Sequence, residues 1–215
     1  PANETSVGEI RRVPHADGSV AAINTASKIE VALAETRRSV VLDRGEAWFQ
    51  VAKDAKRPFV VEAGRVRVQA VGTAFSVRRR DDGADVLVTE GVVEAWADGA
   101  EGNRIRLIAG QSAFVADNAA IERAAAVPSS VDRKLAWRSG KIDLLGETLT
   151  GAIAEFNRYN QRQIVLADPA LEAEQFDGVF RTDDPEGFAI AVKSALDVPV
   201  DVSGSGAIRI GESRR

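Results

Sequence analysis

The chain has 215 residues, of which 45% are hydrophobic and 28% charged, a composition typical of a folded globular protein. Its formal net charge of −4 gives no support to nucleic-acid binding, which usually goes with a basic excess. No apolar run approaches the length of a membrane span, and no signal peptide opens the sequence.

Two residue types are missing and a third occurs once. The absence of cysteine excludes disulfides, thiolate metal sites and cysteine nucleophiles, and the single His15 cannot supply an ordinary zinc site or a Ser-His-Asp triad. We therefore expect no metal, no cofactor and no conventional enzyme. Methionine is also absent, even at the first position, which predicts that the sequence is a piece of a longer chain.

Residues 1–127 are predicted to form an all-β domain. Apolar residues alternate with polar ones in several short runs, as in Ile29-Val31-Leu33 and Val66-Val68-Ala70. Turn signals separate these runs at intervals of roughly ten residues, which is typical of a β-sandwich or a solenoid-like stack of strands. They fall at residues 17–18, 43–45, 63–64, 81–83, 98–99 and 109–110.

The stretch from Val66 to Arg79, VRVQAVGTAFSVRR, changes its alternation in the middle. Val66, Val68 and Ala70 are in one phase and Thr73, Phe75 and Val77 in the other, which predicts a β-bulge near Gly72. The Thr73 hydroxyl would then lie beside the Gly72 carbonyl, and its attack on a strained peptide bond would lead to self-cleavage. In the alternative interpretation the pair only bends the strand, and the hydroxyl satisfies a backbone group.

Residues 128–135 are predicted to be a linker and residues 136–212 a small α+β domain. A short helix somewhere in the stretch of residues 116–134 is an open alternative. Two segments have an apolar stripe at helical spacing, and Asp183 or Asp184 is expected to cap the second helix ahead of Pro185. Short strand candidates flank both helices in the order β-α-β and then β-α-β-β, a duplicated pattern. The two stripes consist of Leu149, Ala152, Ile153 and Phe156, and of Phe188, Ala191, Val192 and Ala195.

A further group of residues suggests a carbohydrate site. Glu46 and Asp54 flank the aromatic pair Trp48-Phe49, a combination that would suit an acid pair or a sugar-stacking platform. Trp48 and Phe49 point to opposite faces of a strand, so at most one lies in the core. Turn carboxylates around a core aromatic residue explain the same pattern.

The segment from Arg44 to Trp96 resembles the FecR family, the sensor part of anti-sigma regulators in cell-surface signalling. The resemblance rests on RGEAWFQVAKDAKRPFVVEAG, on VRVQAVGTAFSVRR and on VLVTEGVVEAW, with an upstream DGSVAAINTAS. Residues 136–212 are similar to the small secretin/TonB short N-terminal (STN) domain, through AWRSGKIDL, LTGAIAEFNRYN and GVFRTDDPEGF. Some FecR-family members cut themselves at a Gly-Thr bond in the sensor, as proposed above for Gly72-Thr73.

The resemblance implies a periplasmic sensor in a single-pass inner-membrane protein, with its membrane helix outside this sequence. The implied partner is the signalling domain of a TonB-dependent outer-membrane transporter, whose loading with a siderophore or another ligand is relayed to an extracytoplasmic-function (ECF) sigma factor. Docking by strand addition is expected in the C-terminal domain, at an open strand edge supplied by residues 198–202 or by Ile208 and Ile210. An STN-like domain also occurs in secretin-type envelope assemblies, so a structural role is an alternative, as is glycan binding. The candidate docking residues are Asp177, Val179, Val198, Val200, Val202, Ile208 and Ile210.

Overall fold

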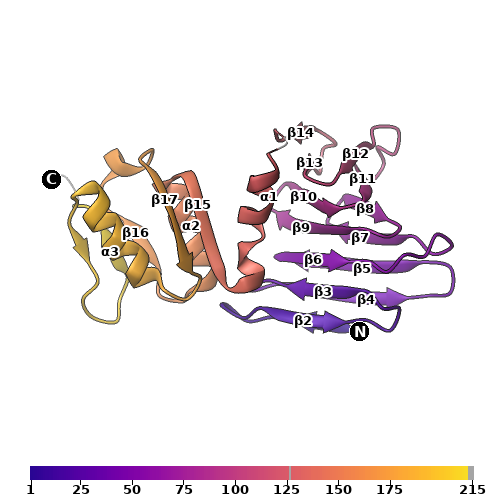
Figure 1. Cartoon of the computed structure of the whole chain (residues 1–215), viewed down its shortest axis with the longest axis horizontal. Coiled ribbons are helices and arrows are strands. Elements are labelled where there is room, and N and C mark those ends of the chain that lie inside the picture. The colour runs from indigo at the N-terminus through magenta and orange to yellow at the C-terminus, as the bar shows by residue number, and fades with distance from the viewer. Residues whose placement is uncertain (126, 213–215) are drawn as a thin grey trace. The chain divides into compact units, whose positions relative to one another are not determined.

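The computed structural model describes residues 1–125 and 127–212, and the chain divides into two compact units, Pro1–Asp132 and Arg133–Arg215. The N-terminal unit is built from strands, and the C-terminal unit combines helices with small sheets (Figure 1). This is the predicted fold class.

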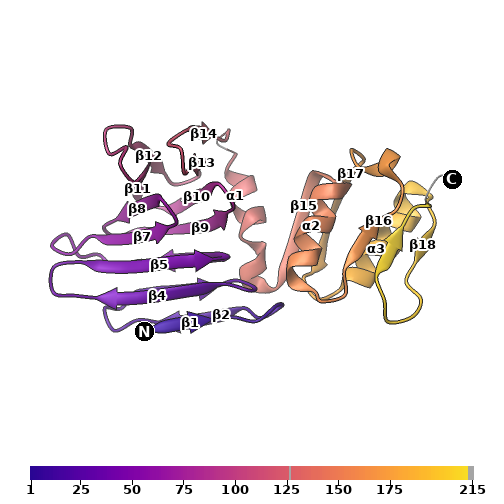
Figure 2. The ribbon, with the colours of Figure 1, turned by 180° about the vertical axis from the view of Figure 1, so that it is seen from behind.

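The N-terminal unit consists of two seven-stranded sheets. Figures 1 and 2 show it from opposite sides, with the strands of each sheet lying side by side along the unit. All pairings are antiparallel except that of β5 with β7. The first sheet has the order β1 (Ala2–Glu4), β4 (Lys28–Leu33), β5 (Arg38–Arg44), β7 (Phe59–Ala63), β8 (Val66–Ala70), β11 (Val92–Ala97) and β12 (Ile105–Ile108). The second has the order β14 (Ile121–Arg123), β13 (Ser112–Ala116), β10 (Gly83–Glu90), β9 (Ala74–Arg80), β6 (Glu46–Gln50), β3 (Val20–Ile23) and β2 (Arg11–Pro14).

The core of this unit lies between the two sheets. Alternate residues of each strand point inward, so the predicted alternation marks the buried positions correctly. Phe49, Phe59 and Phe75 meet at its centre, with ring centroids 5.6 to 6.5 Å apart. Each large buried side chain contributes roughly 1.5–3 kcal/mol through removal of apolar surface from water.

The stretch from Val66 to Arg79 is two strands in different sheets, so the predicted bulge at Gly72 is wrong. β8 belongs to the first sheet and β9 to the second, and residues 71–73 carry the chain from one to the other. Val68 and Phe75 face the same core from opposite sides, which reverses the alternation without an inserted residue. The register irregularity lies instead in the neighbouring strand β10, between Val88 and Glu90.

The predicted linker contains a helix. α1 (Pro128–Lys134) is followed by the 3₁₀ turn η1 (Ala136–Ser139), which Gly140 ends in a left-handed conformation. A proline at the first helical position costs little, because the amide it lacks would have no intrahelical partner there. The boundary between the two compact units falls inside α1.

The C-terminal unit contains two small sheets and two helices. β15 pairs antiparallel with β17, and in the other sheet β19 pairs parallel with β16 and antiparallel with β18. The chain order repeats strand, helix and strand, as the sequence predicts. The elements are β15 (Lys141–Thr148), α2 (Leu149–Tyr159), β16 (Ile164–Leu166), η2 (Pro169–Leu171), β17 (Gln175–Arg181), α3 (Pro185–Leu196), β18 (Val200–Asp201) and β19 (Ile208–Ile210).

Both helices bury one face against these sheets. The predicted apolar stripe of α2 is buried. On α3, the predicted stripe residue Ala195 is exposed, and Ala189, which was not predicted, is buried. Asp184, rather than Asp183, caps α3 by accepting a hydrogen bond from the Gly187 amide over 2.9 Å. Four phenylalanine rings with centroids 4.4 to 6.1 Å apart hold the unit together: Phe156, Phe176, Phe180 and Phe188.

Candidate functional site

Four described segments of the chain cross between the two sheets at one end of the N-terminal unit. Residues 51–58, here called the strap, lead from β6 to β7, residues 71–73 lead from β8 to β9, Gly91 leads from β10 to β11, and residues 109–111 lead from β12 to β13. The crossings are neighbours because β7 pairs with β8, and because β9 pairs with both β6 and β10. The Gly72-Thr73 bond therefore lies in a crossing that has the strap on one side and Gly91 on the other.

Two close approaches explain the glycines at this point. A Cβ on Gly72 would lie 2.9 Å from Lys53 Cβ and 3.1 Å from Lys53 Cα, so only glycine leaves room for the strap. Gly91 has a φ of +76°, and a Cβ there would lie 2.8 Å from Thr73 Cγ2 and 3.1 Å from the Gly72 carbonyl oxygen. The Gly72-Thr73 peptide is thus packed between the strap and Gly91.

The Thr73 side chain is buried, with 6% of its surface exposed. Its Oγ1 has no hydrogen-bond partner among the described residues, so the alternative in which this hydroxyl satisfies a backbone group is wrong. Leaving a buried hydroxyl unpaired costs about 1–3 kcal/mol. Such groups in native structures call for an explanation, and a reactive role is one of them.

The backbone on both sides of the bond is held by the strap. The Val51 amide donates to the Thr73 carbonyl oxygen over 2.8 Å, and the Asp54 amide donates to the Val71 carbonyl oxygen over 3.1 Å. These two hydrogen bonds fix Val71 and Thr73, the residues before and after Gly72. The position of the Gly72-Thr73 peptide bond therefore depends on the strap.

The predicted acid pair does not form. Glu46 begins β6 and is buried, accepting a hydrogen bond from Asn24 Nδ2 over 3.0 Å. Asp54 lies beyond the other end of β6, in the strap, where the hydrogen bond from Arg57 lowers the pKa of its carboxyl. Trp48 is half-buried and donates to Thr89 Oγ1 over 3.3 Å, while Phe49 is in the core, on the opposite face as predicted.

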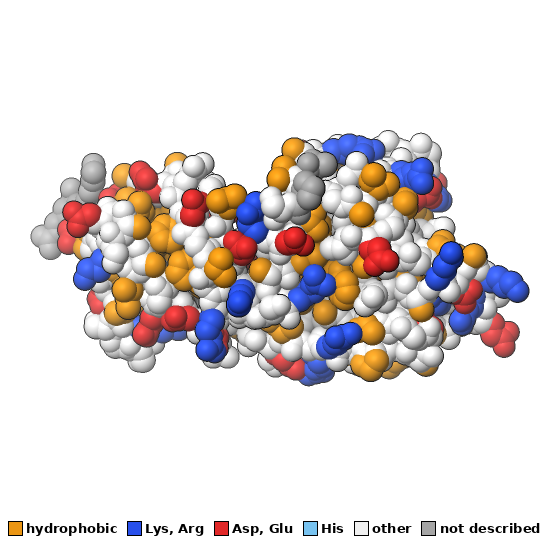
Figure 3. All heavy atoms as spheres, viewed as in Figure 1, with side chains coloured by type: hydrophobic (Ala, Val, Ile, Leu, Met, Phe, Trp, Pro, Cys, Tyr) orange, Lys and Arg blue, Asp and Glu red, His pale blue; other side chains and the backbone are white. Residues whose placement is uncertain are grey.

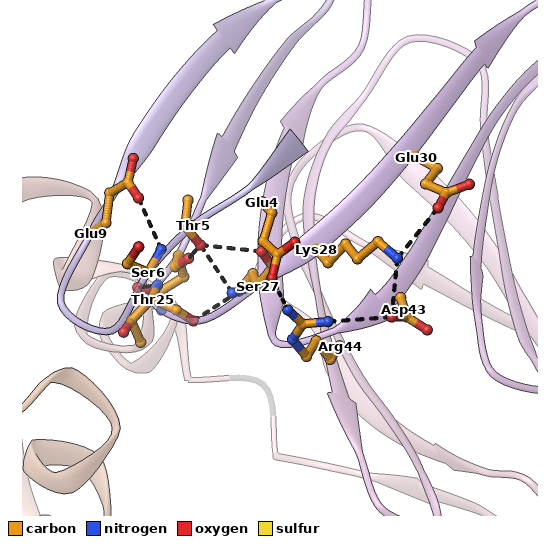
Figure 4. A network of polar contacts seen from close by, with 11 residues as sticks. Glu4, Thr5, Ser6, Glu9, Thr25, Ser27, Lys28, Glu30, Asp43 and Arg44 are labelled. Atoms are coloured by element: carbon orange, nitrogen blue, oxygen red, sulfur yellow. Dashed lines mark hydrogen bonds and ion pairs between the residues drawn. The ribbon is translucent and has the colours of Figure 1, made fainter. Parts of the chain in front are cut away.

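The opposite end of the unit holds a buried polar network at the crossing from β3 to β4 (Figure 4). Thr5 Oγ1 donates to the Asn24 carbonyl oxygen over 2.6 Å and accepts from the Ser27 amide over 2.9 Å. Ser27 Oγ in turn accepts from the Glu46 amide over 2.9 Å. These side chains satisfy backbone groups, which indicates a structural role. Exposed ion pairs lie beside them and connect Glu4, Lys28, Glu30, Asp43 and Arg44.

The predicted docking residues of the C-terminal unit have different surroundings. Val179 is 59% exposed in β17 and Asp177 is also exposed, whereas Val200 is half-buried in the two-residue edge strand β18. Ile208 and Ile210 are fully buried in β19, which has a partner strand on each side. The prediction that these two isoleucines supply an open edge is therefore wrong. Val198 and Val202 are half-buried beside β18.

A shallow hollow of this unit was not predicted from the sequence. It lies between Leu145-Gly146 of β15, the first residues of β17 and the last turn of α3. Leu145 is 60% exposed beside it. The hollow depends on strand pairing and helix packing, which a local sequence pattern does not indicate.

The surface seen in Figure 3 carries basic and acidic side chains intermixed, with hydrophobic side chains between them. Over residues 1–125 and 127–212, no cluster of three or more histidine, aspartate and glutamate side chains has a metal-binding arrangement. No helix in the described part of the chain has the length and apolar character needed to cross a membrane.

The family model described as FecR protein matches residues 2–94, within the N-terminal unit. Two crystal structures of a candidate anti-sigma factor from Parabacteroides distasonis ATCC 8503 superpose on the chain with TM-scores of 0.80 and 0.79, each at 22% sequence identity. The alignments cover 100% of this chain and 100% and 99% of those chains, so the whole fold is shared. Curated protein sequences gave no significant match. The FecR match includes the Gly72-Thr73 crossing, the strap and Gly91.

Proposed function

We propose that this chain is the sensor part of a transmembrane anti-sigma regulator in cell-surface signalling. The observation that carries the proposal is the FecR match over residues 2–94, which lies within the N-terminal unit. The candidate anti-sigma factor from Parabacteroides distasonis has a similar fold over the whole length of both chains. In this role the chain lies in the periplasm and acts by binding rather than by turnover. An ECF sigma factor receives the signal through a cytoplasmic segment of the same regulator.

The proposed partner is the signalling domain of a TonB-dependent outer-membrane transporter, docked on the STN-like C-terminal unit. The sheet of β15 and β17 supports this choice because, among the described residues, each strand pairs only with the other. β17 offers a seven-residue edge, against two residues in β18, and a longer edge provides more backbone hydrogen bonds for an added strand. Leu145 and Val179 present exposed apolar surface beside it.

Titration of the chain with the signalling domain of its cognate transporter, followed by calorimetry, tests this function. A saturable complex is expected, and no detectable complex would exclude the proposal. Val179→Arg should weaken binding at least tenfold if β17 is the docking strand, because a buried interfacial charge without a partner is costly. Val165→Arg is the matched control, an exposed valine in β16 of the other sheet. Weakening by the control alone would move the docking site to that sheet.

A second proposal concerns the Gly72-Thr73 bond, which we propose is cut by the chain itself. The unpartnered, buried Thr73 hydroxyl favours it. Thr73 Oγ1 attacks the Gly72 carbonyl carbon, the C–N bond breaks, and the hydroxyl proton passes to the departing Thr73 nitrogen. The product is an ester between Gly72 and Thr73 Oγ1. Water then hydrolyses the ester, leaving a Gly72 carboxylate and a Thr73 amino terminus.

Intact mass measured over time on the purified protein tests the scission. Two fragments that meet between Gly72 and Thr73 are expected, and Thr73→Val should remain whole, since it keeps the shape of the side chain without the nucleophile. Hydroxylamine should release Gly72 as a hydroxamate, since it traps an ester and not an amide. A wild-type chain that stays whole under both conditions excludes the scission without affecting the docking proposal.

A further inference from the structure

One ion pair of the N-terminal unit has both of its side chains almost fully buried. The side chain of Arg38 is 0% exposed and that of Asp17 is 3% exposed, with Nη1 and Oδ2 at 3.0 Å. Arg38 Nη2 has no hydrogen-bond partner among the described residues. A buried pair of this kind adds little stability compared with apolar side chains, and an unpaired donor adds a cost. The pair therefore needs another explanation than stability.

The contacts of the pair supply that explanation. Arg38 donates through Nη1 to the Ala52 carbonyl oxygen over 2.7 Å and through Nε to the Arg57 carbonyl oxygen over 2.8 Å. One guanidinium thus holds the strap near its beginning and near its end. Asp17 acts on the same segment indirectly, since it accepts from Ser19 Oγ over 2.8 Å, and Ser19 Oγ accepts from the Ala52 amide over 3.0 Å.

Next to the first anchored point, and between the two, the strap meets the crossing of residues 71–73. Val51 and Asp54 donate to the carbonyl oxygens of Thr73 and Val71, and Lys53 lies against Gly72. Arg38 itself touches neither Gly72 nor Thr73 through any of its hydrogen bonds. Its influence on the bond passes through the strap.

We propose that Arg38 is a positioning residue, which with Asp17 fixes the strap onto the Gly72-Thr73 crossing. Release of the guanidinium frees the strap, and with it the amides of Val51 and Asp54 that hold the backbone on either side of the bond. The expected slowing of cleavage rests on the proposed scission of Gly72-Thr73. The expected loosening of the strap does not, because it follows from the hydrogen bonds of Arg38 alone.

Amide hydrogen exchange measured by NMR on the full chain tests the proposal. The double variant Arg38→Met/Asp17→Asn removes both charges, so no unpaired charge is left buried. Exchange of the Val51 and Asp54 amides should become faster on the order of tenfold or more, because local opening no longer breaks charge-assisted bonds. The amides of β9, which is paired on both sides, should keep their protection and serve as the reference for global folding.

The opposite end of the unit provides a matched control. Arg79 and Asp117 form a two-fold hydrogen-bonded pair there, at 2.8 and 2.6 Å, and Arg79 also binds the Ala63 and Gly83 carbonyl oxygens. Arg79→Met/Asp117→Asn should leave the exchange of the Val51 and Asp54 amides unchanged. Unchanged exchange of these amides in the Arg38 double variant would overturn the proposal.

A milder variant and a second readout complete the test. If the double variant loses protection in β9 as well, Ser19→Ala decides: faster exchange limited to the strap supports the proposal, and unchanged exchange overturns it. Intact mass over time should show slower scission in the Arg38 double variant than in the wild type. If the wild type is never cut, the scission fails, and the exchange data still decide whether Arg38 positions the strap.

Discussion

Gly91 lies directly against Thr73, so closely that a Cβ on Gly91 would come within 2.8 Å of Thr73 Cγ2. Gly91→Ala should therefore destabilise the chain for two reasons. A left-handed φ of +76° costs an alanine about 1–2 kcal/mol, and overpacking against a fixed crossing adds about 1–3 kcal/mol. Urea denaturation measures the total.

Gly110→Ala separates the two contributions. Gly110 has a similar φ of +86°, but a Cβ there would meet nothing within 4 Å. Gly110→Ala should therefore show the conformational cost alone, and the excess in Gly91→Ala measures the contact with Thr73. Equal losses in both variants would contradict the packing of Gly91 on this crossing.

Thr73→Val should increase the free energy of unfolding of the N-terminal unit. The valine keeps the shape and removes an unpaired buried hydroxyl, so a gain of about 1 kcal/mol is expected. Thr5→Val is the control, because Thr5 is equally buried but its hydroxyl is hydrogen-bonded to Asn24 and Ser27. It should lose stability. A loss of similar size in Thr73→Val would show that the Thr73 hydroxyl is paired.

The sequence predicts local features of this fold and misses those decided at long range. The alternation in Val66-Val68-Ala70 marks buried positions because a strand turns alternate side chains to one face. A bulge and a change of sheet both reverse that alternation, and only the pairing of β8 with β7 and β11 separates them. In the same way, the apolar alternation at Ile208 and Ile210 fits either an edge strand or a central strand. In the structure their strand, β19, is central, because it pairs with β16 on one side and with β18 on the other.

The sequence predicts only part of the candidate site, because local patterns are visible in it and long-range contacts are not. Gly72 and Thr73 stand out in the sequence because the alternation changes there. The surroundings of Thr73 are not local, since the strap lies 15 to 22 residues before it and Gly91 lies 18 residues after it. Arg38 gave no signal, since an arginine at the start of a strand is ordinarily exposed.

Asp184→Ala should weaken the C-terminal unit through the first turn of α3. The Asp184 carboxylate accepts from the Gly187 amide, and loss of a helix cap of this type costs about 1 kcal/mol. Asp183→Ala is a matched control, because Asp183 is exposed and forms an ion pair with Arg181 that contributes little. Thermal denaturation followed by circular dichroism compares the two. A larger loss from Asp183→Ala would place the cap one residue earlier.

Acidification should weaken the anchoring of the strap. Burial acts to raise the pKa of Asp17, but hydrogen bonds from Ser19 and Arg38 outweigh it and hold that pKa below its ordinary value. The folded state then binds fewer protons at Asp17 than the unfolded state does. Its contribution to stability is complete above the unfolded pKa, about 3.9, and is lost as the pH falls through the folded pKa.

The comparison of wild type with Asp17→Asn isolates this effect, because every other carboxyl group titrates in both proteins. The free-energy difference between them should be largest at about pH 6 and should shrink toward about pH 3. Exchange of the Val51 and Asp54 amides, corrected for the intrinsic pH dependence of exchange, should lose protection over the same interval in the wild type alone. A difference that stays constant with pH would mean that Asp17 keeps its ordinary pKa, and that Arg38 holds the strap without it.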